Sequence, residues 1–212
     1  MAASAGRTRN PRGQGERLRT ALMDAARGLM LELGDQDKLS VRAVTSRAGV
    51  SANALYLHFA DKDELLSAVM IASYKELRTF LRAAVPPDAD PMTQLRAFAG
   101  AYIEFATQRP GIYRVLFMTK VRAGVPVPAP GAESGLDEGV DTFNDLLEIV
   151  THCMPNEPEP FVQSAYIWAG LHGFVALQQV IPAFPWPSGR DYVEHLIEIH
   201  VEASVERSDH AR

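Results

Sequence analysis

The sequence is short of residues and patterns on which several classes of protein depend. Only one of its 212 residues is a cysteine, Cys153, which excludes an internal disulfide framework and suits a reducing compartment. No apolar run approaches the roughly 20 residues that cross a bilayer, and the N-terminus lacks the apolar stretch of a secretory signal. We therefore expect a cytoplasmic protein with no membrane partner.

Signatures of catalysis are also missing. The chain has no Gly-rich phosphate loop, no Gly-x-Ser-x-Gly motif and no pair of histidines at metal-binding spacing. His152 and Cys153 are adjacent, and adjacent side chains on a helix point in different directions. Three residues near the C-terminus could share one side of a helix, but a solvated face explains them better: Glu194, His195 and Glu198. The sequence predicts no enzyme, no metal and no cofactor.

Charge is distributed unevenly along the chain. The net charge is −5, which taken alone argues against DNA binding. Residues 1–60, however, hold nine Lys and Arg against five Asp and Glu, while residues 61–212 hold twelve against twenty-one. A basic N-terminal part on an acidic remainder is typical of a protein whose N-terminal end faces nucleic acid.

Two short helical patterns flank Gly49. Ser40 precedes the first and Ser51 the second, where a hydroxyl can accept a hydrogen bond from the free N–H groups of an opening helical turn. Gly49 falls just past the first helix, where a residue with positive φ is common. Apolar residues at helical spacing face inward: Val41, Val44, Leu55 and Phe59. The stretch predicts a helix-turn-helix, whose second helix enters a DNA major groove.

An ordered set of residues in this stretch carries a family resemblance: Ala48-Gly49-Val50-Ser51, then Leu55-Tyr56-x-His58-Phe59, then Lys62 and Leu65-Leu66. With these residues, roughly 13–70 of the chain resembles the TetR family of transcriptional regulators. A shorter segment resembles the Trp…His-Gly signature of one subgroup of TetR C-terminal domains: Trp168-Ala169-Gly170-Leu171-His172-Gly173.

The resemblance implies that residues 51–57 form a recognition helix. It implies base contacts from four residues: Arg42, Ala52, Asn53 and Ala54. It implies contacts to the DNA backbone from five: Ser40, Ser51, Tyr56, His58 and Lys62. Asn53 is the strong hydrogen-bonding group of the helix, and its amide suits the N6/N7 edge of adenine. Alternatively, Tyr56 and His58 pack between the helices of the domain.

Helical periodicity continues to the end of the chain, and prolines separate the segments. We find no convincing strand and expect an all-α fold of about nine helices in three parts: a disordered basic arm at 1–13, a DNA-binding domain at 14–60 and a ligand-binding and dimerisation domain at 61–212. The later helices are expected at about 61–84, 91–108, 112–118, 136–152, 161–180 and 190–206, with a mobile loop at 120–135. The arm either has no role or adds contacts to phosphate or the minor groove.

The C-terminal domain is rich in aromatic residues on its predicted helices. Large apolar walls with a few polar groups are typical of small-molecule sites. The candidate pocket residues are Phe98, Tyr102, Phe105, Tyr113, Phe117, Phe143, Trp168 and His172. The alternative for each aromatic residue is a place in the core, and for His172 a structural hydrogen bond.

A single helix-turn-helix contacts few base pairs, so we expect a homodimer on a palindrome-like operator of double-stranded DNA. The candidate interface lies on the last two helices. It comprises small residues that allow close approach, Ala165, Ala169, Gly173 and Ala176, and residues of the final helix, Val193, Leu196, Ile197 and His200. Alternatively, these faces pack within one subunit.

Two functional hypotheses follow from the sequence. In the first, the protein is a repressor that a small, largely apolar effector releases from its operator, which requires that the effector bind the two states with different affinity. In the second, it is an architectural or adaptor protein that binds DNA and whose C-terminal domain engages a protein partner.

Overall fold

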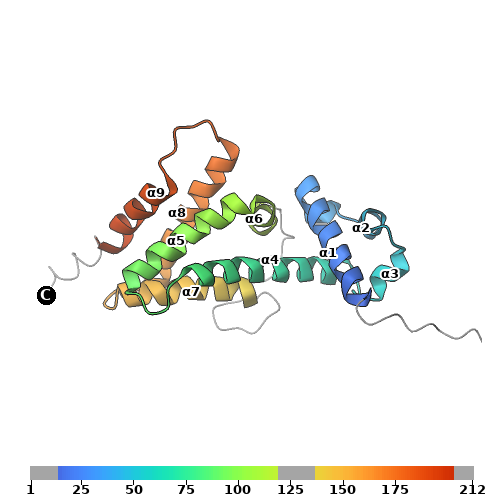
Figure 1. Ribbon diagram of the computed structural model, residues 1–212, viewed down its shortest axis with the longest axis horizontal. Helices are drawn as coiled ribbons and strands as arrows, with labels where there is room; N and C mark the ends of the chain where they lie inside the picture. The colour runs from blue at the N-terminus through green and yellow to red at the C-terminus, as the bar shows by residue number, and fades with distance from the viewer. Residues whose placement is uncertain (1–13, 119–136, 203–212) are drawn as a thin grey trace, which may run out of the picture. The chain divides into compact units, whose positions relative to one another are not determined.

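The computed structural model describes residues 14–118 and 137–202 (Figure 1). Within these ranges the elements are all helical and none is a β-strand, which confirms the predicted fold class. The basic arm predicted at 1–13 and the loop predicted at 120–135 lie outside the described residues.

The described residues form two compact units, which divide within one long helix between Met70 and Ile71. The first unit, the head, contains these elements: α1 (Gln14–Leu33), η1 (Gln36–Lys38), α2 (Val41–Ala48), α3 (Ala52–Tyr56) and α4 (Lys62–Ala84) as far as Met70. The second unit, the body, contains the rest of α4 and the following elements: α5 (Pro91–Gln108), α6 (Pro110–Phe117) as far as Leu116, α7 (Asp137–Cys153), α8 (Pro160–Val180), α9 (Gly189–Ile197) and η2 (Glu198–Glu202). The domain boundary predicted between residues 60 and 61 precedes α4.

Most helix ends follow the capping chemistry of the sequence. Asp61 Oδ1 accepts a hydrogen bond from the Glu64 N–H at 2.8 Å, and Glu64 Oε2 accepts one from the Ala60 N–H at 2.5 Å. This reciprocal pair resembles a capping box at the start of α4. It differs in one bond, because the Glu64 carboxylate accepts from the N–H of Ala60 and not from that of the capping residue Asp61. Asp90 caps α5 through the Thr93 N–H at 3.0 Å, with Pro91 in the first turn.

Packing in the body centres on α5, which contacts α7, α8 and α9 (Figure 1). Its buried side chains include Leu95, Ala99, Ile103 and Ala106. The final helix differs from its prediction at 190–206. The α-helical pattern ends at Ile197, and a π-helical turn continues to Glu202, where the described residues end.

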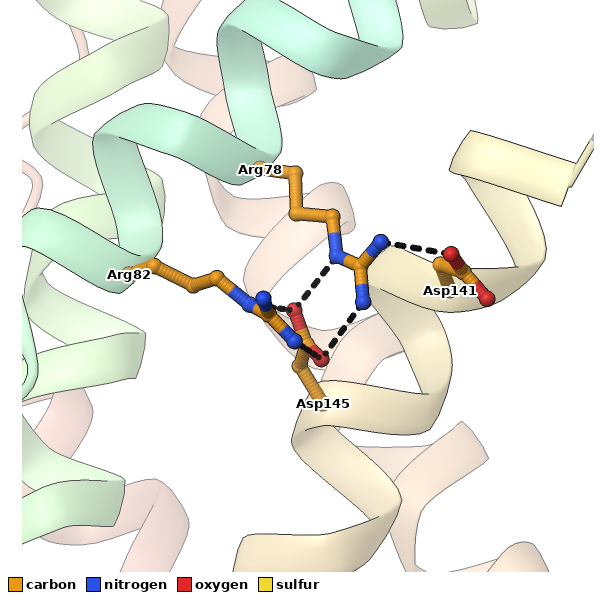
Figure 2. Close-up of polar contacts among 4 residues, drawn as sticks. All are labelled: Arg78, Arg82, Asp141 and Asp145. Atoms are coloured by element: carbon orange, nitrogen blue, oxygen red, sulfur yellow. Dashed lines mark hydrogen bonds and ion pairs between the residues drawn. The ribbon is translucent and has the colours of Figure 1, made fainter. Parts of the chain in front are cut away.

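A group of four charged side chains joins α4 to α7, and we call it the α4–α7 ion-pair cluster (Figure 2). Both oxygens of Asp145 accept from Arg78, at 2.9 and 3.1 Å, and both also accept from Arg82, at 2.9 and 2.7 Å. Arg78 donates a further bond to Asp141 at 2.5 Å. The Asp145 side chain is 14% exposed. A carboxylate so placed is stabilised by two bidentate guanidinium groups, each of which fixes geometry as well as charge.

Two opposing effects act on the pKa of Asp145. Burial raises it, and the hydrogen bonds and positive charges of Arg78 and Arg82 lower it, with a net lowering from the ordinary value. A folded-state pKa below the unfolded value means that the ionised carboxylate stabilises the fold. This stabilisation is fully present above the unfolded pKa of about 4 and is lost as the pH falls through the folded pKa.

Replacing Asp145 by Asn should lower the free energy of unfolding of the body by about 2 kcal/mol at pH 7, because two guanidinium groups lose their anion. The difference from the wild type should narrow at pH 3. Urea unfolding followed by tryptophan fluorescence measures this, since Trp168 and Trp186, the two tryptophans of the chain, both lie in the body. Asp141→Asn is the matched control. It removes one bond to a more exposed carboxylate and should cost less than about 1 kcal/mol. Equal stability of Asp145→Asn and the wild type at pH 7 would contradict the role given to the cluster.

Candidate functional site

The helix-turn-helix of the head is built from α2, α3 and the turn between them. Ser40 Oγ accepts from the Ala43 N–H at 3.2 Å, and Ser51 Oγ accepts from the Ala54 N–H at 3.3 Å. Gly49 has φ of 71°, and the Val50 N–H donates to the Thr45 carbonyl at 2.9 Å, which closes the end of α2. Both predicted caps and the predicted glycine turn are therefore confirmed.

The inner faces of α2 and α3 hold the unit together. Val44, Leu55 and Phe59 are buried, as the spacing predicted, and Val41 is half-buried. The Arg19 guanidinium lies over the Phe59 ring, 5.1 Å from its centroid. A helix of five residues such as α3 has little stability of its own, so this burial fixes its position.

The outer face carries most of the residues expected to contact DNA. Arg42, Ala52 and Asn53 are exposed. The Tyr56 side chain is 54% exposed, so it does not pack between the helices of the head. Ala54, His58 and Lys62 are half-buried, and His58 lies beside α1, where a Cβ on Gly15 would stand 3.6 Å from its ring.

The two arginines of α2, Arg42 and Arg47, differ in whether they form an ion pair within the head. Arg47 Nη2 and Glu32 Oε1 of α1 are 2.8 Å apart, and the hydrogen bond from Arg47 lowers the pKa of Glu32. Arg42 has no such partner among the residues that the structure describes. Arg47 therefore ties α2 to α1, and Arg42 is free for another ligand. No local pattern distinguishes the two arginines, because Glu32, the partner of Arg47, lies on another helix.

A chain of aromatic contacts crosses the body. The Tyr113 hydroxyl is 2.7 Å from His172 Nδ1, with the two rings stacked at 5.8 Å. Tyr102 meets Tyr113 edge-on at 6.0 Å, Trp168 lies 6.5 Å from His172, and Phe143 lies 6.0 Å from Trp168. We call these five residues the aromatic cluster.

Burial shifts the pKa values of the central pair of the aromatic cluster. It raises the pKa of Tyr113 to about 12 and lowers that of His172, and both shifts favour the uncharged side chains. A neutral imidazole with its proton on Nε2 accepts a hydrogen bond from the phenol O–H at Nδ1. The pair therefore suits a hydrogen bond between uncharged groups.

Two of the predicted pocket residues lie elsewhere. Phe105 is buried against Phe80, with ring centroids 5.5 Å apart, and Phe98 lines a cavity on the body surface. Phe117 is the last residue of α6 and is half-buried. Within the cluster, Tyr102 and Tyr113 are buried as core side chains. Helical spacing indicated that these rings face inward but not which of them meet.

Two family models match the chain. The description "Bacterial regulatory proteins, tetR family" matches residues 22–69, and "Tetracyclin repressor-like, C-terminal domain" matches residues 95–203, which is just over half of the sequence. The chain belongs to the TetR family. It is accordingly a DNA-binding transcriptional regulator with a helix-turn-helix, as the resemblance implied. Its place in the Trp…His-Gly subgroup stays a prediction.

Solved structures show the same fold. A protein of unknown function from Rhodococcus sp. RHA1 is 25% identical, with a TM-score of 0.69 and coverage of 92% of this chain and 98% of its own. The fatty acid degradation regulator FadR from Bacillus halodurans is 14% identical, with a TM-score of 0.69 and coverage of 91% and 97%. The transcriptional regulator FadR from Bacillus subtilis, solved with stearoyl-CoA, is 14% identical, with a TM-score of 0.68 and coverage of 86% and 97%.

The predicted dimer residues of this TetR-family protein fall into two groups. On α8, Ala169 is exposed, and open space surrounds the Cβ position of Gly173. Ala165, Ala176 and His200 are half-buried. On α9, three residues are buried inside the chain's own body because α9 packs against α5 and α8: Val193, Leu196 and Ile197. These three are core residues of the single chain, which favours the alternative that this face packs within one subunit, and their part in a dimer stays a prediction.

In the part of the chain that the structure describes, no group of three or more His, Cys, Asp or Glu side chains is arranged to hold a metal ion. No described helix combines the length and apolar character needed to span a membrane.

The turn at Gly49 gives a test of the head. Gly49→Ala should lower the free energy of unfolding by about 1 kcal/mol, because alanine strains at positive φ although no atom blocks its methyl group. Gly100→Ala is the matched control. Gly100 lies inside α5 with open space around it, so the same change should raise stability by up to about 1 kcal/mol. Urea unfolding followed by circular dichroism measures both. The same sign for both variants would refute the strain argument.

Proposed function

We propose that this TetR-family protein is a repressor that binds a palindrome-like operator as a homodimer and leaves it when a small, largely apolar effector binds the body. The observation that carries the DNA part is the outer face of α2 and α3. It combines an unpaired guanidinium at Arg42, an exposed amide at Asn53 and an exposed phenol at Tyr56.

The side chains on this face have different chemistry toward DNA. Asn53 lies on α3, the predicted recognition helix, and can make two hydrogen bonds to one adenine. Ala52 and Ala54 offer only methyl contacts, for example to thymine. Tyr56 and Lys62 suit phosphate oxygens, which fix register without selecting sequence. The half-buried His58 and the capping hydroxyls of Ser40 and Ser51 are further backbone contacts in this proposal.

Variants separate the two kinds of contact. Asn53→Ala should weaken the free energy of DNA binding by about 1–3 kcal/mol for each half-site and relax the base preference at one position. Lys62→Ala should weaken binding to all duplexes and lower the salt slope by about two for a dimer, since each head loses one phosphate contact. Selection from a random DNA pool identifies the operator, and fluorescence anisotropy at several salt concentrations then gives affinity and slope.

The matched control is Lys75→Ala, an exposed lysine of α4 within the body. It should leave both the affinity and the salt slope unchanged. An unchanged affinity of the double variant Tyr56→Phe with Lys62→Ala would remove the phosphate contacts from the proposal.

The dimer part is supported by the outward face of α8. This helix has no Asp, Glu, Lys or Arg, and its apolar residues are not confined to one face, which is typical of a helix buried on several sides. In the single chain, however, Tyr166, Ala169, Leu177 and Val180 are exposed, the last at 72%. Pairing this face with the same face of a second copy removes a contiguous apolar surface from water.

A charge placed on this face tests the dimer. Ala169→Arg should convert the dimer to monomer, because an arginine without an anion would be buried at the interface. Sedimentation equilibrium measures the change. Thr151→Arg, at an exposed position on α7, is the control and should remain dimeric. A wild-type protein that is monomeric at micromolar concentration would contradict this part of the proposal.

The effector part is supported by the aromatic cluster. Its rings offer apolar contacts, and the Tyr113–His172 pair offers polar atoms that could anchor a ligand. FadR from Bacillus subtilis has the same fold and is solved in complex with stearoyl-CoA, which supports an apolar effector in this proposal. Tyr102 and Tyr113 are buried here, so binding requires a more open body that the effector favours.

The close packing of the same cluster also favours a second candidate function. A body that stays closed would serve as an adaptor or architectural element, with a protein partner in place of a small molecule. Thermal-shift measurements against a library of apolar compounds distinguish the two, because an effector that binds the folded body raises its melting temperature.

A further inference from the structure

A cavity lies on the surface of the body, and its lining shares no residue with the aromatic cluster. Its volume is about 480 Å³, within the usual range of about 300–1,000 Å³ for small-molecule sites. It is formed by the end of α4, the connection to α5, the start of α5 and one face of α7. The lining includes a floor of apolar side chains: Val85, Pro87, Ala89, Pro91, Phe98 and Ile149.

Two of the charged groups in the lining form an ion pair with each other. Arg82 and Asp145 belong to the α4–α7 ion-pair cluster, where Figure 2 shows the Arg82 guanidinium directed at the Asp145 carboxylate. The two oxygens of Asp145 accept four hydrogen bonds from Arg78 and Arg82. Four is the full capacity of a carboxylate, so Asp145 has no acceptor site left for a ligand.

The third charged group in the lining is Glu148, which forms no ion pair with a described residue. It follows Asp145 by one turn of α7, is exposed, and has no ionic or hydrogen-bonding partner among the described residues. The neighbouring connection, residues 86–90, carries Asp88 and Asp90 and no basic residue. The remaining polar side chains of the lining, Gln94 and His152, do not supply a fixed positive charge. The available charge of the cavity is therefore negative.

We infer that this cavity binds a small monocation with an apolar body, such as a primary amine or quaternary ammonium on an aryl or alkyl group. The apolar part would lie on the floor, and the cationic group would pair with the Glu148 carboxylate. This class of ligand differs from the effector proposed above, and the site shares no residue with the aromatic cluster. The inference does not depend on operator release, because binding alone tests it.

Three probes of matched shape test the inference on the full-length protein: 4-phenylbutylamine, 4-phenylbutanol and 4-phenylbutyrate. Isothermal titration calorimetry at neutral pH and low salt should show one amine bound per chain. The neutral alcohol should bind at least about threefold more weakly, and the anion more weakly still, because only the amine pairs with the free carboxylate. Absence of amine binding, or an anion that binds as tightly as the amine, overturns the inference.

Two variants locate the site. Glu148→Gln should weaken amine binding by about three- to tenfold and leave the affinity for the alcohol unchanged, since it removes the charge alone. Glu104→Gln makes the same change on the exposed face of α5, outside the cavity, and should have no effect. Ala89→Trp should fill the cavity and abolish binding of amine and alcohol, with folding checked by circular dichroism. Amine affinity that Glu148→Gln leaves unchanged, or that survives in folded Ala89→Trp, assigns the binding to another place and refutes the proposed site.

Discussion

One carboxylate, that of Asp145, fixes the part of α4 that lies in the body. Two guanidinium groups four residues apart on α4 would repel each other without an anion between them, and Asp145 accepts a bidentate pair from each. The same helix begins in the head at Lys62 and ends in the body at Ala84. α4 therefore contributes its first residues to the head and its last residues to the body, where Asp145 fixes its position against α7.

The head depends on burial in a different way. α2 and α3 have eight and five residues, too few to be stable alone, and they are held by the buried Val44, Leu55 and Phe59 and by hydroxyl caps at both starts. The inward residues hold the helices together, so the outward side chains are not needed for packing and are available to contact DNA. This division explains why Arg47 and Arg42, on one short helix, have separate roles. Arg47 stabilises the head through Glu32, and Arg42 has no ionic partner among residues 14–118 and 137–202.

The sequence predicted what local chemistry determines. The caps at Ser40 and Ser51, the turn at Gly49 and the start of α4 at Asp61 each depend on residues within four positions, and all are present. The α4–α7 ion-pair cluster was missed because its partners are 63 to 67 residues apart in the chain. A signal existed in retrospect: two arginines and two aspartates, each pair spaced by four. Amphipathic spacing likewise predicted that Val193, Leu196 and Ile197 face an apolar surface but could not show that the surface is the chain's own body.

The two candidate sites of the body differ in what a ligand must do on entering. At the aromatic cluster, an effector has to separate packed rings and break or replace the Tyr113–His172 hydrogen bond, so the closed state must be left first. At the surface cavity the space already exists and the free carboxylate is exposed. Binding there favours the present arrangement of α4 and α7, because the lining includes Arg82 from one and Asp145 from the other. A ligand of the first kind therefore has to open the packed rings, whereas a ligand of the second kind binds the arrangement of α4 and α7 that the structure already has.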